Sequence, residues 1–177
     1  LRADRFDEAL ARAEEALAMY WRVYGVPHPD MPYAMTTIAA ASVALGDTAR
    51  ADTMHVRALD MRRALAGPDG PDLYMSHRDF GRHLLATGRA DEAVPHLREA
   101  LRVARLARGE DHEWYGTALW HLGRAHESLG ELEEAETLLR RAYDIHVDAL
   151  GSNHAVVADE RAYLVGLLRR SSATTAW

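Results

Sequence analysis

The sequence contains no cysteine and no lysine, and it has only two phenylalanines among 177 residues. Without cysteine the chain can form no disulfide, carry no thiol nucleophile and bind no zinc through sulfur. No apolar run approaches the roughly 20 residues that a membrane-spanning helix requires, and no secretory signal pattern opens the chain. We therefore expect a cytoplasmic protein that has no membrane partner.

The charged residues are spread along the chain instead of gathering in one block. The 21 basic residues are all arginines, and 27 acidic residues among them give a formal net charge of −6. A nucleic-acid binder typically concentrates its basic residues on one face or in one stretch. The charge pattern therefore argues against a nucleic-acid partner.

Glycine, in contrast, recurs with a fixed interval of 42 residues. One set ends every second helical pattern and consists of Gly25, Gly67, Gly109 and Gly151. A second set separates the two helical patterns within each unit and consists of Gly46, Gly88 and Gly130. Apolar and small residues between the glycines follow three- and four-residue spacings, which indicate amphipathic helices. The chain is therefore predicted to be an array of helix-turn-helix repeats.

The periodicity predicts an all-α fold of about eight helices and no strands. Asp30 is expected to cap the second helix, because its side chain can accept a bond from a free backbone N–H there. Short connections make neighbouring helices antiparallel, and stacked pairs form an α-solenoid that winds into a right-handed superhelix. The expected helices span residues 1–24, 31–45, 48–65, 73–87, 90–107, 113–129, 132–150 and 156–170.

The repeat phase assigns residues 1–170 to a single array, followed by a tail at 171–177. The chain begins in the second helix of a repeat, so we expect it to be a fragment of a larger protein, of a bacterial regulatory or signalling kind. The array comprises that lone helix (1–24), three full repeats (25–66, 67–108 and 109–150) and a lone first helix (151–170).

Small residues at fixed places in each unit resemble the tetratricopeptide repeat. An aliphatic-small pair occurs in the first helix of each full unit, glycine precedes the second helix, and alanine occurs twice within it. The 42-residue period, the His-Pro-Asp sequence at 28–30 and the ending at 141–151 resemble the kinesin-light-chain type. The resemblance implies a scaffold that binds a protein or an extended peptide in a concave groove, without a cofactor and without catalysis. The aliphatic-small pairs are Ile38-Ala39, Phe80-Gly81 and Leu122-Gly123.

The groove positions depart from the resembled family. Kinesin-light-chain repeats typically carry paired asparagines just before the aliphatic-small pair, and these help to bind peptide. The same slots here hold Thr36-Thr37, Arg78-Asp79, Trp120-His121 and Ala162-Tyr163. The kinesin mode of cargo recognition is therefore not expected in this chain.

Alignment of the repeats on their glycines predicts which side chains face the groove. They come from the first helix of each unit and from the last helix of the chain. The predicted peptide-binding residues are Tyr33, Thr36, Thr37, Met75, Arg78, Asp79, Arg82, Thr117, Trp120, His121, Arg124, Glu127, Asp159 and Tyr163.

Three arginines of this set allow two interpretations. Arg78 and Arg82 are one helical turn apart, and Arg124 occupies the slot of Arg82 one repeat later. Since guanidinium binds carboxylates in a bidentate manner, the three could clamp an acidic or C-terminal carboxylate group, with Trp120 as an apolar platform. Alternatively, they could pair with Asp79, Glu127 or Asp159 across neighbouring helices and stabilise the stack slightly.

Other functions have weaker support. His28, His112 and His154 share one slot in successive connectors, so they should lie a repeat apart, too far to share a metal ion. No phosphate-binding loop or nucleophile motif is present, and we predict neither catalytic nor metal-binding residues. Self-association through the unpaired end helices is the main alternative to peptide binding. The large aromatic residues Trp21, Tyr24 and Tyr143 are expected in the core.

Overall fold

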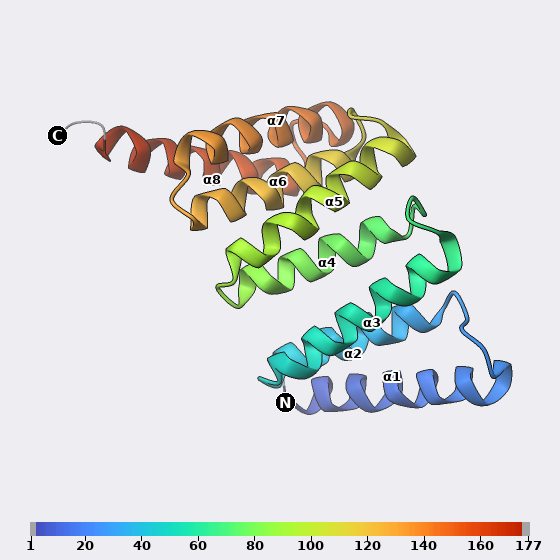
Figure 1. Cartoon of the computed structure of the whole chain (residues 1–177). Helices are drawn as coiled ribbons and strands as arrows, with labels where there is room; N and C mark the ends of the chain where they lie inside the picture. Colours follow the sequence, from blue (N-terminus) through green and yellow to red (C-terminus); the bar gives the residue numbers. More distant parts are fainter. Residues whose placement is uncertain (1–2, 175–177) are drawn as a thin grey trace. The chain divides into compact units, whose positions relative to one another are not determined.

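The computed structural model describes residues 3–174, and within this range the chain forms eight α-helices and no strands (Figure 1). The type and order of the predicted elements are confirmed. The helices are α1 (Ala3–Tyr24), α2 (Met31–Ala44), α3 (Thr48–Ala66), α4 (Leu73–Ala86), α5 (Ala90–Arg108), α6 (Glu113–Ser128), α7 (Leu132–Leu150) and α8 (Ala155–Thr174).

The last helix is longer than predicted. Because α8 continues to Thr174, residues 171–174 are helical where the sequence predicted a tail, and 175–177 lie outside the described residues. The tail begins with Ser171-Ser172-Ala173, which contains neither glycine nor proline to stop the helix.

No helix in the described part of the chain is long and apolar enough to cross a membrane.

The helices fall into two compact units, Leu1–Phe80 and Gly81–Trp177, called here the N-terminal and the C-terminal unit. The boundary between them lies within α4. In the N-terminal unit α1 packs on α2 and α2 packs on α3. In the C-terminal unit α5 packs on α6, α6 on α7 and α7 on α8. That all the repeats stack as a single array stays a prediction.

Glycine ends the helices as the sequence predicts. Gly130 has a φ of 82°, a backbone conformation that other residues reach only with strain. Its N–H donates to the carbonyl of Glu127 over 3.0 Å, and the next N–H, of Glu131, donates to the carbonyl of His126 over 2.9 Å. These bonds satisfy carbonyls that the end of α6 would otherwise leave without a partner.

The connector histidines His112 and His154 cap the helices that follow them. The Nδ1 atom of His112 accepts a hydrogen bond from the N–H of Trp114 over 3.1 Å, and His154 accepts one from Val156 over 3.3 Å. Asp30 is the N-cap residue of α2, as predicted, but its side chain makes no capping hydrogen bond to the helix. Its carboxylate accepts a bond from the Tyr20 hydroxyl at 3.4 Å, and its own N–H donates to His28 Nδ1 at 3.2 Å.

Glycine within the first helices lets the second helices approach closely. A Cβ atom added at Gly81 would lie 2.6 Å from the side chain of Leu97, and one added at Gly123 would lie 2.7 Å from that of Leu139. Leu139 also forms a core cluster with Leu164 of α8. The aliphatic-small pairs therefore place the first and second helices of a repeat at the short distance that the C-terminal unit requires.

We expect Gly123→Ala to lower the free energy of unfolding by about 1–3 kcal/mol, because the new methyl group would overlap the fully buried Leu139. Gly166→Ala in α8 is the matched control. Its Cβ would meet only the end of Arg170, at 3.7 Å, so the alanine should leave stability unchanged or raise it by up to about 1 kcal/mol. Urea unfolding followed by circular dichroism measures both, and equal effects would contradict this packing account.

Candidate functional site

Helices α6 and α8 of the C-terminal unit enclose a cleft of about 470 Å³. Each helix contributes four lining residues at positions i, i+3, i+4 and i+7, which is one face of a helix. Six of these eight residues, and Arg82 from α4, belong to the predicted groove. The lining residues of α6 are Thr117, Trp120, His121 and Arg124, and those of α8 are Val156, Asp159, Glu160 and Tyr163.

An aromatic pair forms one side of this cleft. The rings of Trp120 and Tyr163 meet edge to face, with their centroids 5.4 Å apart. The guanidinium of Arg124 lies 4.5 Å from the centre of the Tyr163 ring and 3.6 Å from the carboxylate of Glu127. The Tyr163 hydroxyl donates to Glu127, which also accepts a bond of 2.6 Å from Arg170. These contacts fix the orientation of the aromatic pair.

Burial, followed by the hydrogen bond to the Glu127 carboxylate, raises the pKa of Tyr163 to about 12. The phenol therefore keeps its proton throughout the neutral range and remains a hydrogen-bond donor. Glu127, although part of the predicted groove, serves the chain itself by holding Tyr163 and Arg170 in place.

A buried pair, His146 of α7 and Glu160 of α8, also contributes to the lining of the cleft. His146 Nδ1 lies 2.8 Å from Glu160 Oε1, and the two side chains are only 3% and 5% exposed. Its Nε2 atom lies 3.3 Å from the Glu113 carbonyl and 3.3 Å from the Thr117 hydroxyl. Burial alone would lower the pKa of His146, but the Glu160 carboxylate and the Glu113 carbonyl raise it overall. The contacts of the ring thus favour its charged form.

This pair makes stability depend on pH. Since the pKa of His146 is raised on folding, its contribution is complete below the unfolded value of about 6.5 and is lost as pH rises through the folded value. We expect the difference in unfolding free energy between wild type and His146→Gln to shrink as pH rises above about 6.5. A constant difference for His146→Gln would contradict a charged His146.

A second, smaller cleft of about 290 Å³ lies between α4 and α6 of the same unit. Arg82, His121 and Arg124 line both clefts, so the two openings are adjacent across α6. The structure therefore brings together Arg82 and Arg124, two of the three arginines of the predicted clamp, and places His121 in the same lining.

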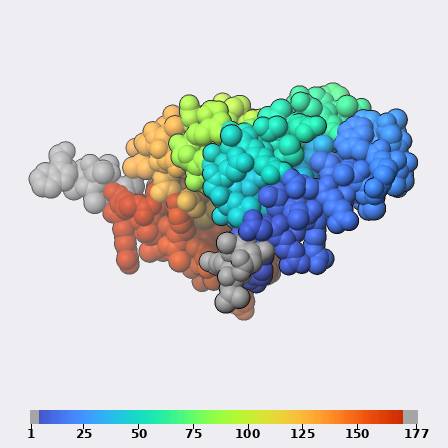
Figure 2. Space-filling model, turned by 90° about the horizontal axis from the view of Figure 1, so that it is seen from below, coloured from blue at the N-terminus to red at the C-terminus, as the bar shows by residue number. Residues whose placement is uncertain are grey.

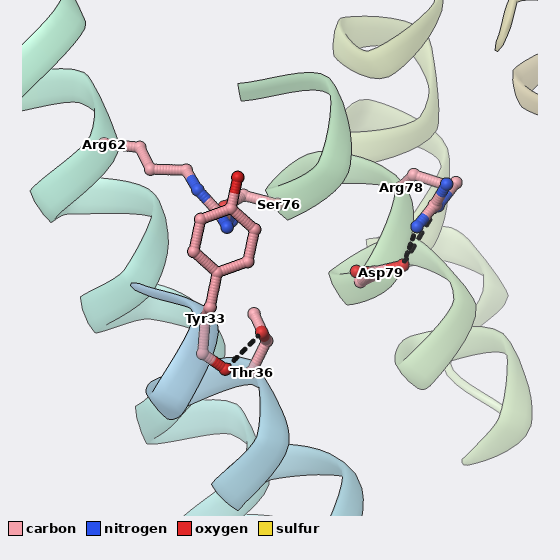
Figure 3. A network of polar contacts seen from close by, with 6 residues as sticks. All are labelled: Tyr33, Thr36, Arg62, Ser76, Arg78 and Asp79. Atoms are coloured by element: carbon pink, nitrogen blue, oxygen red, sulfur yellow. Dashed lines mark hydrogen bonds and ion pairs between the residues drawn. The ribbon is translucent and has the colours of Figure 1, made fainter. Parts of the chain in front are cut away.

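The predicted groove residues of the N-terminal unit are largely engaged with the chain. The hydroxyls of Thr36 and Thr37 donate to the carbonyl of Tyr33 over 3.0 and 2.9 Å. The half-exposed ring of Tyr33 lies over the guanidinium of Arg62, at 4.7 Å, as Figure 3 shows. Arg62 itself is buried and donates to the hydroxyl of Ser76. Met75, also of the predicted set, is half-buried in α4.

Arg78 makes a forked contact with its sequence neighbour Asp79. Its Nε and Nη2 atoms donate to one carboxylate oxygen of Asp79 over 3.0 and 2.8 Å (Figure 3). Burial lowers the pKa of Arg78, but the Asp79 carboxylate and Tyr74 together raise it. Arg78 and Arg124 therefore both pair with acidic residues of the chain, as the second interpretation of the arginines holds, although each pair lies within one helix instead of between helices.

Sequence reasoning missed the buried polar pairs Arg62–Ser76 and His146–Glu160. The members of each pair are 14 residues apart and join a second helix to the first helix of the next repeat. The second pair lies 84 residues, or two repeat periods, after the first. One signal could have revealed them. The pairs place polar residues at positions that are alanine in the intervening repeat, where Ala104 and Ala118 are buried.

A wider cleft of about 560 Å³ lies between α1 and α2 of the N-terminal unit. Ala9, Ala13 and Ala16 line it together with Tyr33 and Thr37.

The prediction that Trp21 and Tyr24 are core residues is wrong, because they are 40% and 48% exposed. Their equivalents one and two repeats later are exposed as well, since Trp21 aligns with Arg63 and Arg105, and Tyr24 with Ala66 and Arg108. Tyr143 is half-buried against the cluster formed by Leu139, Leu164 and Leu167.

Within residues 3–174, no three histidine, aspartate or glutamate side chains gather in a way that could hold a metal ion. The connector histidines His28, His112 and His154 each accept a backbone hydrogen bond instead.

Sequence comparison relates the chain to known repeat proteins. A family model described as tetratricopeptide repeat matches residues 1–64 and 72–146. The clustered mitochondria protein homolog of Homo sapiens is 25% identical over 170 residues, and that of Danio rerio is 24% identical over 166. These matches cover 95% and 94% of this chain but only 13% and 12% of the relatives, so the chain spans a small part of their length.

Structure comparison shows the same fold in two solved proteins. BtubC (BKLC) from P. vanneervenii has a TM-score of 0.80 at 20% sequence identity, covering 94% of this chain and 66% of the other. A Podosopora anserina putative kinesin light chain with nearly identical TPR-like repeats has a TM-score of 0.75 at 20% identity, covering 99% and 89%. The predicted α-solenoid of helix pairs and the predicted resemblance are thereby confirmed.

Proposed function

Because the chain belongs to the tetratricopeptide repeat family, whose stacked helix pairs form surfaces for protein interaction, we propose that it binds an extended segment of a protein partner along its first helices. The observation that carries this proposal is the pair of adjacent clefts on α6 of the C-terminal unit. The expected setting is a larger cytoplasmic regulatory or signalling protein of a bacterium, as the sequence predicts.

The properties of the α6–α8 cleft suit such a segment. Its aromatic pair is held in place by Arg124 and Glu127, so little side-chain freedom remains to be lost on binding. Tryptophan and tyrosine contribute much of the energy at protein interfaces when they are well packed at the edge of a pocket. A preformed apolar wall beside a few polar groups is the usual arrangement of a binding site.

The proposal also includes an acidic group on the partner, placed at the α4–α6 cleft. Arg82 and Arg124 both line that cleft, and guanidinium groups bind carboxylates through forked hydrogen bonds. Arg78 is not part of this version of the clamp, because Asp79 already accepts two of its N–H groups. A ligand carboxylate would compete with Glu127 for Arg124.

Trp120→Ala tests the proposal against Trp114→Ala, a matched change on the same helix. Both tryptophans are half-buried, but Trp114 lies beside Arg108 and does not line either cleft. With a peptide selected on the wild-type chain, Trp120→Ala should weaken binding at least about tenfold, and Trp114→Ala should change it little. Isothermal titration gives the affinities. Equal affinities for both variants would overturn the proposal.

Self-association is a second candidate, which the uncovered faces of α1 and α8 favour. Ala9 and Ala16 of α1 are partly exposed, whereas their equivalents in all three later repeats, among them Ala93 and Ala100, are fully buried. Val165 of α8 occupies the repeat position that Gly123 occupies in α6. Gly123 packs on Leu139, whereas Val165 is 45% exposed. Figure 2 shows, in blue, side chains of α1 at the molecular surface. A first helix such as α8 of a second copy could cover α1 head to tail.

Sedimentation across a concentration series tests this second candidate. We expect the mass of the wild-type chain to rise with concentration, and Ala16→Arg to abolish the rise because arginine would fill the α1–α2 cleft. Ala11→Arg is the control, since Ala11 is exposed and does not line that cleft. A chain that remains monomeric at high concentration excludes self-association.

A further inference from the structure

The α6–α8 cleft contains a buried carboxylate that is only half satisfied. Glu160 is 4% exposed, and its Oε1 atom lies 2.8 Å from His146 Nδ1, but its Oε2 atom has no hydrogen-bond partner among the described residues. A buried acceptor left without a donor destabilises the fold, and native structures rarely leave one without a reason. The equivalent positions in the earlier repeats hold Ala34, Ser76 and Ala118, so the stack does not require a carboxylate here.

The residue before it on α8 adds an open negative charge. Asp159 is exposed and lines the same cleft, and its carboxylate makes no hydrogen bond or ion pair with the described residues. The guanidinium of Arg124, across the cleft, contacts Glu127 and the face of the Tyr163 ring, and Arg82 of α4 lines the same cleft. The acceptors that α8 presents to a ligand are therefore those of Asp159 and the Oε2 atom of Glu160.

Apolar surface borders these carboxylates. Val156 lies one turn before Glu160 on the same face of α8, Tyr163 lies one turn after Asp159, and Trp120 packs on Tyr163 from α6. Long basic side chains fit such surroundings, because their aliphatic stems cover apolar surface and their charged heads seek acceptors.

We propose that the α6–α8 cleft receives a basic side chain, lysine or arginine, of the bound segment. Its stem lies against Trp120 and Val156, and its cationic head donates to Glu160 Oε2 and faces Asp159. This inference rests on the proposed function and names the partner chemistry at one of its two clefts. If the segment also places an acidic group near Arg82, it carries a negative charge where it crosses α4 and a positive charge where it crosses α8.

Affinity selection from a library of N-acetylated random peptides provides the test. The acetyl group removes the terminal amine as a competing cation. Peptides that bind the wild-type chain should be enriched in lysine or arginine beside an apolar residue. Replacing that lysine by norleucine, or that arginine by norleucine, removes the charge but keeps an aliphatic stem, and should weaken binding at least about tenfold.

Variants of the chain locate the effect. The double variant Asp159→Asn with Glu160→Gln should bind the basic and the norleucine peptide equally. Asp159→Asn alone leaves the His146–Glu160 pair intact and should reduce the difference, so the result does not depend on the stability of the Glu160 variant. Glu134→Gln, an exposed change at the start of α7, should preserve the full difference.

Each outcome gives a decision. If the selected peptides require Trp120 but show no preference for a basic residue, this inference is overturned and the proposed function stands. The same conclusion follows if the preference for a basic residue persists in the double variant. Equal binding of the basic and norleucine peptides to wild type would mean that water satisfies Glu160. A library that yields no binder on the wild-type chain overturns both proposals.

Discussion

His146→Leu is expected to lower the free energy of unfolding of the chain by about 3–5 kcal/mol, the largest effect of any single change considered. The substitution leaves the carboxylate of Glu160, which is 4% exposed, without its charged partner. A buried charge without compensation destabilises far more than the ion pair stabilises, because removal from water costs several kcal/mol per ion. Urea unfolding at pH 6, followed by circular dichroism, measures the loss.

The double variant His146→Leu with Glu160→Leu separates charge from packing. One repeat earlier the same two positions hold Ala104 and Ala118, both fully buried, so an apolar pair is compatible with the stack. The double variant should recover most of the stability lost in the single one. If both variants lose the same amount, the loss arises from the altered volume, and the ion-pair account of this position is wrong.

Leu139→Ala is expected to lower the free energy of unfolding by about 2–5 kcal/mol. Leu139 is fully buried, lies against Gly123 of α6, and clusters with Leu164 and Leu167 of α8. Truncation would remove contacts with both neighbouring helices and leave a cavity that rigid helices cannot easily close.

Leu106→Ala is the matched control for this change, since Leu106 in α5 is 60% exposed. Its truncation should change the free energy of unfolding by no more than about 0.5 kcal/mol. Equal losses in the two variants, measured by the same urea titration, would contradict the placement of the core at the junction of α6, α7 and α8.

The helices could be predicted from the sequence because the signals that set them are local. Glycine with positive φ ends the helices, as Gly130 ends α6, and small residues such as Gly123 mark the close contacts. The end of α8 was missed because Ser171-Ser172-Ala173 contains no residue that stops a helix. The choice between a tail and another turn of helix lacked a local signal.

The candidate site was only partly predictable. Repeat phase found six of the eight residues that α6 and α8 contribute to the cleft, because phase determines which face of a helix a residue occupies. It could not determine which partner each long side chain chooses, so Arg78 was grouped with Arg82 although it pairs with Asp79. Trp21 and Tyr24 were assigned to packing positions of the first helix, although alignment with Arg63 and Ala66 would have placed both at exposed positions.

The central claim is that a partner segment lies on the first helices of the repeats. Cross-linking with a selected peptide that carries a photoreactive residue tests it most directly, with the attachment sites identified by mass spectrometry of the full chain. The account predicts attachment to α6 and α8, at or next to Trp120, His121, Val156 and Tyr163. Attachment confined to the second helices α5 and α7 would contradict it.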